Sequence, residues 1–177
     1  MRFLKAYINL ITKFNDAAGR YFICWLIYVL IAIMVIVVAR RYFFHRPVTW
    51  GLDMTWMIYS AFIFLGGAYA LVHDAHVSVD LIYNRFSVRV RAFLSMMGYL
   101  ILFFPAFYFL SEYTFYFALK AYTTGETSPY ALWKPAVWPI KFVLFISMVL
   151  LLLQGIAKFF EHLIIFLKGG AECPPSS

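Results

Sequence analysis

Four blocks of apolar residues, each long enough to cross a lipid bilayer, constrain this chain more than any other feature. They cover about residues 21–41, 53–73, 91–119 and 138–166. A helix needs about 20 apolar residues to span the hydrocarbon core, where the backbone can satisfy its hydrogen bonds only within helices or closed barrels. Charged residues make up 13% of the chain, against roughly 25% in soluble domains. The sequence therefore predicts an all-α membrane protein with four transmembrane helices.

The segments between these blocks are short, so we expect a single membrane domain over residues 1–168 and a disordered tail over 169–177. Between Phe3 and Phe14, apolar residues recur at helical spacing, and basic residues occupy the other side. This pattern is typical of an amphipathic helix that lies in the membrane interface. A similar pattern over residues 81–90 predicts a cytoplasmic junction helix between the second and third spans.

The distribution of basic residues indicates how the chain is oriented. If the N-terminus is cytoplasmic, nine of the 15 Lys and Arg residues lie in inner segments and six in outer loops. Basic residues are enriched on the cytoplasmic side of membrane proteins, so we expect both termini in the cytoplasm. The net charge of +7 is explained by the same residues, which flank the apolar blocks and meet lipid headgroups. No nucleic-acid partner is therefore expected.

The segment HDAHVSVD, residues 73–80, places two histidines and a carboxylate on one helix face. His73, His76 and Asp80 are three and four residues apart, a set that could bind a metal ion. The segment begins where the second span ends, at the cytoplasmic surface. Polar residues at such a turn cap helices and solvate the junction, so we predict a structural role and no metal site.

Glu112 is the acidic residue within the apolar body of a span. A carboxylate at that depth is a candidate functional residue because burying its charge is costly. We expect it to pair with a neighbouring basic residue, such as Lys120 or Lys141, or to lie at a contact between subunits. A role in proton coupling is the alternative.

The chain lacks the sequence motifs of common enzymes and carriers. It has no phosphate-binding loop, nucleophile elbow or Gly-rich nucleotide fingerprint. It also has no pair of Gly- or Pro-interrupted helices at corresponding places in two halves, the usual indication of a transport site. We therefore predict that it is no enzyme and carries no catalytic, cofactor, metal or substrate-binding residues of its own.

Three segments together carry a family resemblance. They are RYFFHRPVTWGLDMTW, then FLGGAYALVHDAHVSVDLI, and finally GETSPYALWKPAVWPIK with LLLLQGIAKF. In order and spacing they resemble the small membrane (Q-type) subunit of the tripartite ATP-independent periplasmic (TRAP) transporters. The motif positions, expected to be structural or interface residues, are Arg41, Pro47, Trp50, Asp53, Gly66, His76, Asp80, Ser128, Trp138, Pro139, Lys141, Gln154 and Gly155. Asp53 replaces the more usual Glu, and His73 lies outside the pattern.

The resemblance implies a scaffold subunit in a bacterial inner membrane. Its implied partners are a large elevator-type membrane subunit, which would carry the substrate and sodium sites, a periplasmic receptor and membrane lipids. The implied process is sodium-driven uptake of an organic anion bearing a carboxylate or sulfonate. Two hypotheses concern the outer surface. Arg46 and Lys134 would face the receptor, and Arg41 would form an ion pair with Asp53.

Two other classes of function remain open from the residues. A four-helix haem b anchor of an electron-transfer complex needs axial histidines inside the helices. The four histidines, His45, His73, His76 and His162, all lie at helix ends or in loops. A self-sufficient small exporter would use Glu112 as its proton site.

Overall fold

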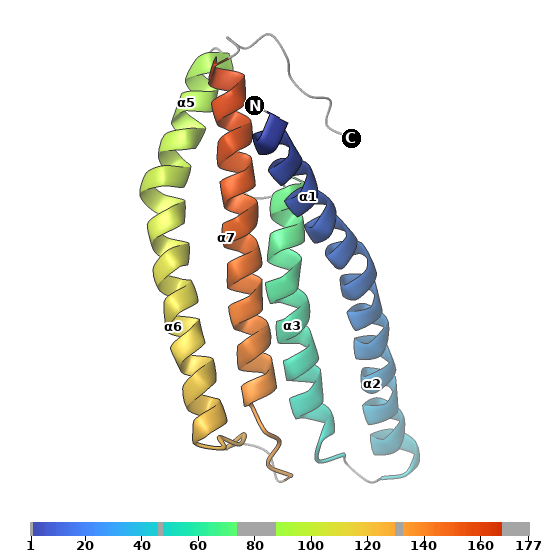
Figure 1. Ribbon diagram of the computed structural model, residues 1–177. Coiled ribbons are helices and arrows are strands. Elements are labelled where there is room, and N and C mark those ends of the chain that lie inside the picture. The colour runs from blue at the N-terminus through green and yellow to red at the C-terminus, as the bar shows by residue number, and fades with distance from the viewer. Residues whose placement is uncertain (1, 46–47, 74–87, 130–132, 168–177) are drawn as a thin grey trace.

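The structure is a computed structural model that describes residues 2–45, 48–73, 88–129 and 133–167. Four helices within it are long and apolar enough to cross a membrane, which confirms the predicted all-α class and number of spans. Two of them are continuous but contain a π-helical turn (Figure 1). The first comprises α1 (Arg2–Ala18), η1 (Gly19–Ile23) and α2 (Cys24–Phe43), and the third comprises α5 (Val88–Gly98), η2 (Tyr99–Phe103) and α6 (Phe104–Thr123). The second and fourth are α3 (Gly51–Val72) and α7 (Trp138–Leu167).

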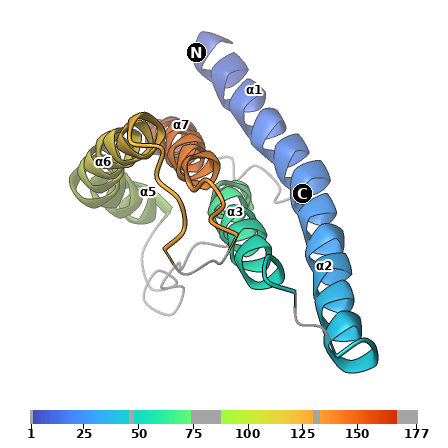
Figure 2. The ribbon, with the colours of Figure 1, turned by 90° about the horizontal axis from the view of Figure 1, so that it is seen from below.

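The helices form a curved row that is one helix thick. Seen from below, α6, α7, α3 and α2 follow one another, with α6 at one edge and α2 at the other (Figure 2). The contacts agree, because α7 packs against both α6 and α3, while α2 packs against α3. Helix α1 begins and α7 ends at the same end of the molecule (Figure 1). An open row of this kind leaves both of its faces without cover from the described chain.

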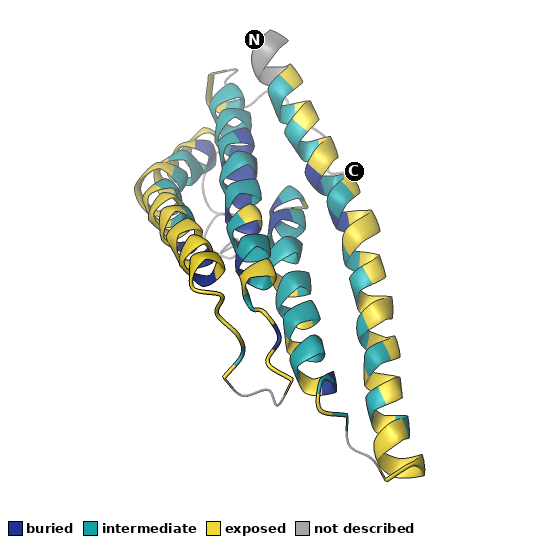
Figure 3. Cartoon of the chain, turned by 60° about the horizontal axis from the view of Figure 1, so that its bottom comes forward, coloured by how far each residue is buried: buried dark blue, intermediate teal, exposed yellow. Residues whose placement is uncertain are grey.

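The core is small and centres on α7. Its buried residues are Ala68 and Leu71 from α3 and Met148 and Leu151 from α7, with Phe103 packed against them. No residue of α2, all of which the structure describes, is buried. Figure 3 shows this contrast, with exposed positions along α2 and the outer side of α6 and buried positions concentrated on α7. Most of the apolar surface of the helices is therefore available to lipid or to another protein.

The N-terminal amphipathic helix is present as α1, but it does not end before the first span. The π-helical turn η1 joins it to α2 without a break, and α1 packs against α7 and α3. The expectation that this segment lies in the plane of the interface stays a prediction. The junction helix predicted around residues 81–90 lies largely outside the described residues, as does the C-terminal tail.

Both π-helical turns contain a residue of a tight contact between a glycine and an aromatic ring. Gly19 in η1 faces Tyr69 of α3, and an added Cβ atom there would lie 2.1 Å from the tyrosine ring. In η2 the aromatic residue lies in the π-turn: an added Cβ atom on Gly155 of α7 would lie 2.1 Å from the ring of Phe103. A π-helical turn shifts the side chains that follow it to a new side of the helix. The two turns therefore coincide with the contacts that hold the first and third spans to the central pair.

Candidate functional site

Polar side chains form two layers, one near each end of the helices. Asp53 lies in the first turn of α3, and His73 directly follows that helix, so the two are about 30 Å apart along the axis. Arg20 and Arg40 are separated by the same number of residues on the first span. This distance equals the thickness of the hydrocarbon core. The spacing of the two layers fits the two surfaces of a bilayer. We call the Asp53 layer the outer layer and the His73 layer the inner layer, after the orientation predicted from the basic residues.

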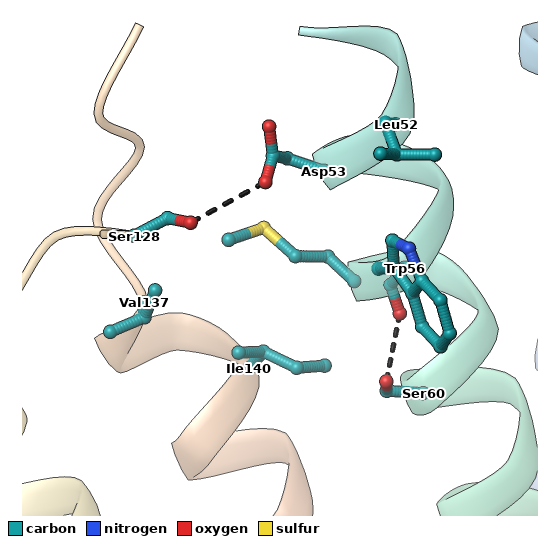
Figure 4. A pocket seen from close by; sticks show the side chains of 8 residues that line it. Leu52, Asp53, Trp56, Ser60, Ser128, Val137 and Ile140 are labelled. Atoms are coloured by element: carbon teal, nitrogen blue, oxygen red, sulfur yellow. Dashed lines mark hydrogen bonds between the residues drawn. The ribbon is translucent and has the colours of Figure 1, made fainter. Parts of the chain in front are cut away.

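In the outer layer, Asp53 connects α3 to the loop between α6 and α7. Ser128 donates a hydrogen bond to one carboxylate oxygen at 3.4 Å, and the Trp133 indole N–H donates to the other at 3.3 Å (Figure 4 shows the first). The hypothesis of an ion pair between Arg41 and Asp53 is wrong. Arg41 is exposed, and its guanidinium lies 5.8 Å from the ring of Tyr42. Asp53 lies on the side of α3 that faces this loop, whereas Gly51, in the same turn, faces Val37 of α2.

Lys141, near the start of α7, holds the same loop through Glu126. Its ammonium group forms an ion pair with Glu126 at an N–O distance of 2.5 Å and lies 3.6 Å from the ring centre of Phe117 on α6. Lys141 is buried, whereas the Glu126 side chain is about half exposed (47%). One backbone hydrogen bond, from the Val137 N–H to the Glu126 carbonyl, crosses the loop at 3.1 Å. The motif lysine therefore anchors the start of α7 to the end of α6.

Gln154 makes the one buried hydrogen bond between amide side chains in the described part of the chain. It accepts from the Asn15 side chain at 2.9 Å, and the two residues are 0% and 2% exposed. The other polar atoms of the pair, Asn15 Oδ1 and Gln154 Nε2, have no partner. Sequence reasoning identified Gln154 as a motif residue but missed Asn15. This contact holds α1 to the inner half of α7.

Gly155, next to Gln154, lets the third span approach α7. Its Cα faces the Phe103 ring, which stacks on Phe107 at a centroid distance of 4.4 Å. The other motif glycine, Gly66, has more room, because an added Cβ atom would lie 3.9 Å from Ile23. The two glycines thus differ: Gly155 is required for close packing, whereas Gly66 is not.

The inner layer contains the described part of the histidine-rich junction. His73 Nε2 lies 3.1 Å from a carboxylate oxygen of Asp16, and Arg20 contacts the other oxygen at 3.4 Å. Asp16 therefore connects α1 to the end of α3. The part of the chain that the structure describes contains no group of three or more metal-ligating side chains. His76 and Asp80 lie outside it, so the structural role predicted for them stays a prediction.

A shallow groove of about 460 Å³ opens beside Asp53, between α3 and the start of α7. Leu52, Trp56, Val137 and Ile140 line it with Asp53 and Ser128 (Figure 4). The walls are mainly apolar; Ser128 donates to Asp53, and Ser60, also in the lining, donates to the backbone carbonyl of Trp56. The groove offers no set of free polar groups that would orient a solute.

The other predicted residues occupy the ends and edges of the row. Trp50 is half-buried before α3, and Trp138 and Pro139 are exposed in the first turn of α7. Lys134 is exposed and has a positive φ of 46°. Arg46 and Pro47 lie outside the described residues. Glu112 is exposed on α6 and pairs with neither Lys120 nor Lys141; Lys141 is bound to Glu126 instead.

Comparison with known protein families gives one match. The family described as "Tripartite ATP-independent periplasmic transporters, DctQ component" matches residues 29–164, most of the chain. The search of curated proteins found no match to this chain. The matched region includes Asp53 and His73 at the two ends of α3, and Lys141 and Gln154 on α7.

Proposed function

Because the chain belongs to the DctQ family of TRAP transporter components, we propose that it is the small subunit that holds a large, solute-moving membrane subunit in place. This family is a family of transporter components and not of enzymes. The family match over residues 29–164 carries the proposal. The proposed role is that of a fixed scaffold in a heterodimer.

The open row of helices supports a scaffold role. The row is one helix thick, its core is small and α2 has no buried residue, so the chain buries little apolar surface by itself. It instead offers a wide apolar surface against which a moving subunit could be held. The hydrogen bonds and ion pairs of the two polar layers connect neighbouring helices of this chain, which would make the layer rigid.

The proposed process is sodium-driven symport of an organic anion, a carboxylate or sulfonate, across a bacterial inner membrane. Substrate and sodium sites would lie in the large subunit, and this chain would carry no cofactor. The described residues support this division, because the groove beside Asp53 is mainly apolar. Both termini would be cytoplasmic, so that the loop between α6 and α7 faces the periplasm.

That loop is the proposed contact for a periplasmic receptor. Its described parts are fixed by Asp53, Lys141 and an isolated β-bridge between Thr127 and Ala136. Lys134, exposed near this β-bridge, and Arg46 in the other outer loop would meet acidic groups of the receptor. Replacing Lys134 by glutamate should lower uptake at limiting receptor concentration and leave uptake unchanged when the receptor is in excess. An equal loss at all receptor concentrations would contradict this contact.

The test of the proposed function is uptake in proteoliposomes. The large subunit, this chain and the receptor are reconstituted with a sodium gradient, and each component is left out in turn. We expect solute uptake only when all three proteins and the gradient are present. Uptake by this chain alone, or undiminished uptake without it, would overturn the proposal.

A further inference from the structure

Glu112 lies between exposed tyrosines on the free side of α6, the helix at one edge of the row. Tyr108, Glu112 and Tyr116 follow each other at intervals of four residues, so they share one face of α6. Both tyrosines are exposed, as is Glu112. The opposite face of α6, which includes Thr114 and Ala118, is buried. These three side chains therefore point away from the rest of the chain.

The depth of Glu112 places it inside the hydrocarbon core. It precedes Lys120, in the last turn of α6, by eight residues, which corresponds to about 12 Å along the helix. Its neighbour Phe115 packs against Phe145 of α7, with ring centroids 5.2 Å apart. Phe145 belongs to the apolar body of α7. Glu112 thus lies beside apolar parts of the bundle, well below the outer layer.

Within the described residues, Glu112 has no hydrogen bond or ion pair. The four ion pairs there are formed by other acids, namely Asp16 (twice), Glu126 and Glu161. A carboxylate in a transmembrane segment almost always faces a protein interior or an aqueous cavity, because contact with lipid is costly. Glu112 faces outward from this chain. The interior that it faces must therefore be supplied by another chain.

The opposite edge of the layer has a different character. Between Arg20 and Arg40 the first span carries no charged residue. Its outward residues are mainly aromatic up to Tyr28 and aliphatic from Val29 to Val38. Such a surface is satisfied by lipid. The α6 edge combines tyrosines and a carboxylate, and aromatic residues are enriched in the cores of protein interfaces. The two edges are therefore suited to different neighbours.

We propose that the face of α6 formed by Tyr108, Glu112 and Tyr116 binds the large transporter subunit, and that a basic side chain on one of its membrane helices pairs with Glu112. The proposal rests on the proposed function, because it assigns the binding face for that partner. Charge complementarity identifies the occupant: an anionic group surrounded by apolar rings at this depth requires a cation brought by a membrane helix. The edge formed by α2 faces lipid.

Site-specific photocrosslinking in the intact complex tests this assignment. The photoreactive residue p-benzoylphenylalanine replaces Tyr108 in one variant and Tyr28 of α2 in the other. The two tyrosines are a matched pair, since they are 59% and 69% exposed and each lies 12 residues from the outer basic residue of its span, Lys120 or Arg40. We expect an adduct with the large subunit from Tyr108 and none from Tyr28.

A second measurement tests the charge. Glu112→Gln keeps the shape of the side chain but removes its charge, so the complex should dissociate more readily, with the Kd raised roughly three- to twentyfold. Glu112→Arg should abolish assembly, and reversing the charge of the crosslinked basic residue of the large subunit should restore it. An unchanged Kd for Glu112→Gln would contradict the ion pair.

The crosslinking outcomes separate this proposal from the proposed function. A stable complex that crosslinks through Tyr28 and not Tyr108, or equally through both, would overturn the assignment of the face and leave the scaffold role intact. An adduct of Tyr108 with a second copy of this chain, or with lipid only, would also overturn it. A wild-type chain that never co-purifies with the large subunit would overturn the proposed function itself.

Discussion

Replacing Gln154 by leucine should weaken the attachment of α1 to α7 by removing a buried partner of Asn15. The two amides share one hydrogen bond of 2.9 Å in a site that is closed to solvent. In the variant, the Asn15 amide keeps its burial but loses its only acceptor. A buried donor without a partner costs about 1–3 kcal/mol. The leucine recovers part of this by burying more apolar surface, so we expect a net loss of about 1–2 kcal/mol.

The double variant gives the sharper test because both polar partners are then removed. Replacing Asn15 and Gln154 together by leucine eliminates the hydrogen bond and also the two atoms that lack partners in the wild type. The double variant should therefore be less destabilised than the sum of the single variants, with a coupling of about 0.5–2 kcal/mol. Asn9→Leu is the matched control, since Asn9 lies on the same helix but is exposed. Its effect should stay within about 0.5 kcal/mol.

The assay is unfolding of the detergent-solubilised complex by sodium dodecyl sulfate, followed by circular dichroism. The free energies of the wild type, the two single variants, the double variant and the control complete the cycle. If Gln154→Leu unfolded like the wild type, or if the two single effects were strictly additive, the amide pair would not hold α1 in place.

Two further predictions concern contacts of α7. Gly155→Ala should destabilise the chain by about 1–3 kcal/mol, because the new methyl group would meet the Phe103 ring at 2.1 Å, whereas Gly66→Ala should be neutral or slightly stabilising. The same unfolding assay compares the two, and equal effects would contradict the packing argument. Lys141→Met should release the loop that Glu126 helps to hold. Limited proteolysis should then cleave this loop faster than in the wild type, and an unchanged rate would show that the ion pair does not restrain it.

The number and class of the spans follow from the sequence because long apolar blocks leave a membrane-spanning chain little choice but helices. The sequence also identifies Gln154, Gly155 and Lys141 as important, but not what they contact. Asn15, the partner of Gln154, is 139 residues away along the chain. A local signal existed, since Asn15 continues the row of Tyr7 and Ile11 at intervals of four residues and interrupts it with an amide.

The order of the helices in the layer cannot be read from periodicity. Arg41 and Asp53 lie near each other in the sequence and at the same end of the molecule, which suggested an ion pair. Asp53 is instead bonded to Ser128 and Trp133, which follow it by 75 and 80 residues and lie in the loop between α6 and α7. For Glu112, the sequence gives the depth in the membrane, whereas only the fold shows that it faces outward.

The most direct test of the account is the native mass of the membrane complex. The tagged chain is expressed with the large subunit encoded in the same organism, extracted in mild detergent and analysed by native mass spectrometry. We predict a single assembly that contains one copy of this 20.6 kDa chain and one copy of the large subunit. Masses that are only multiples of 20.6 kDa, with the large subunit absent, would contradict the scaffold role.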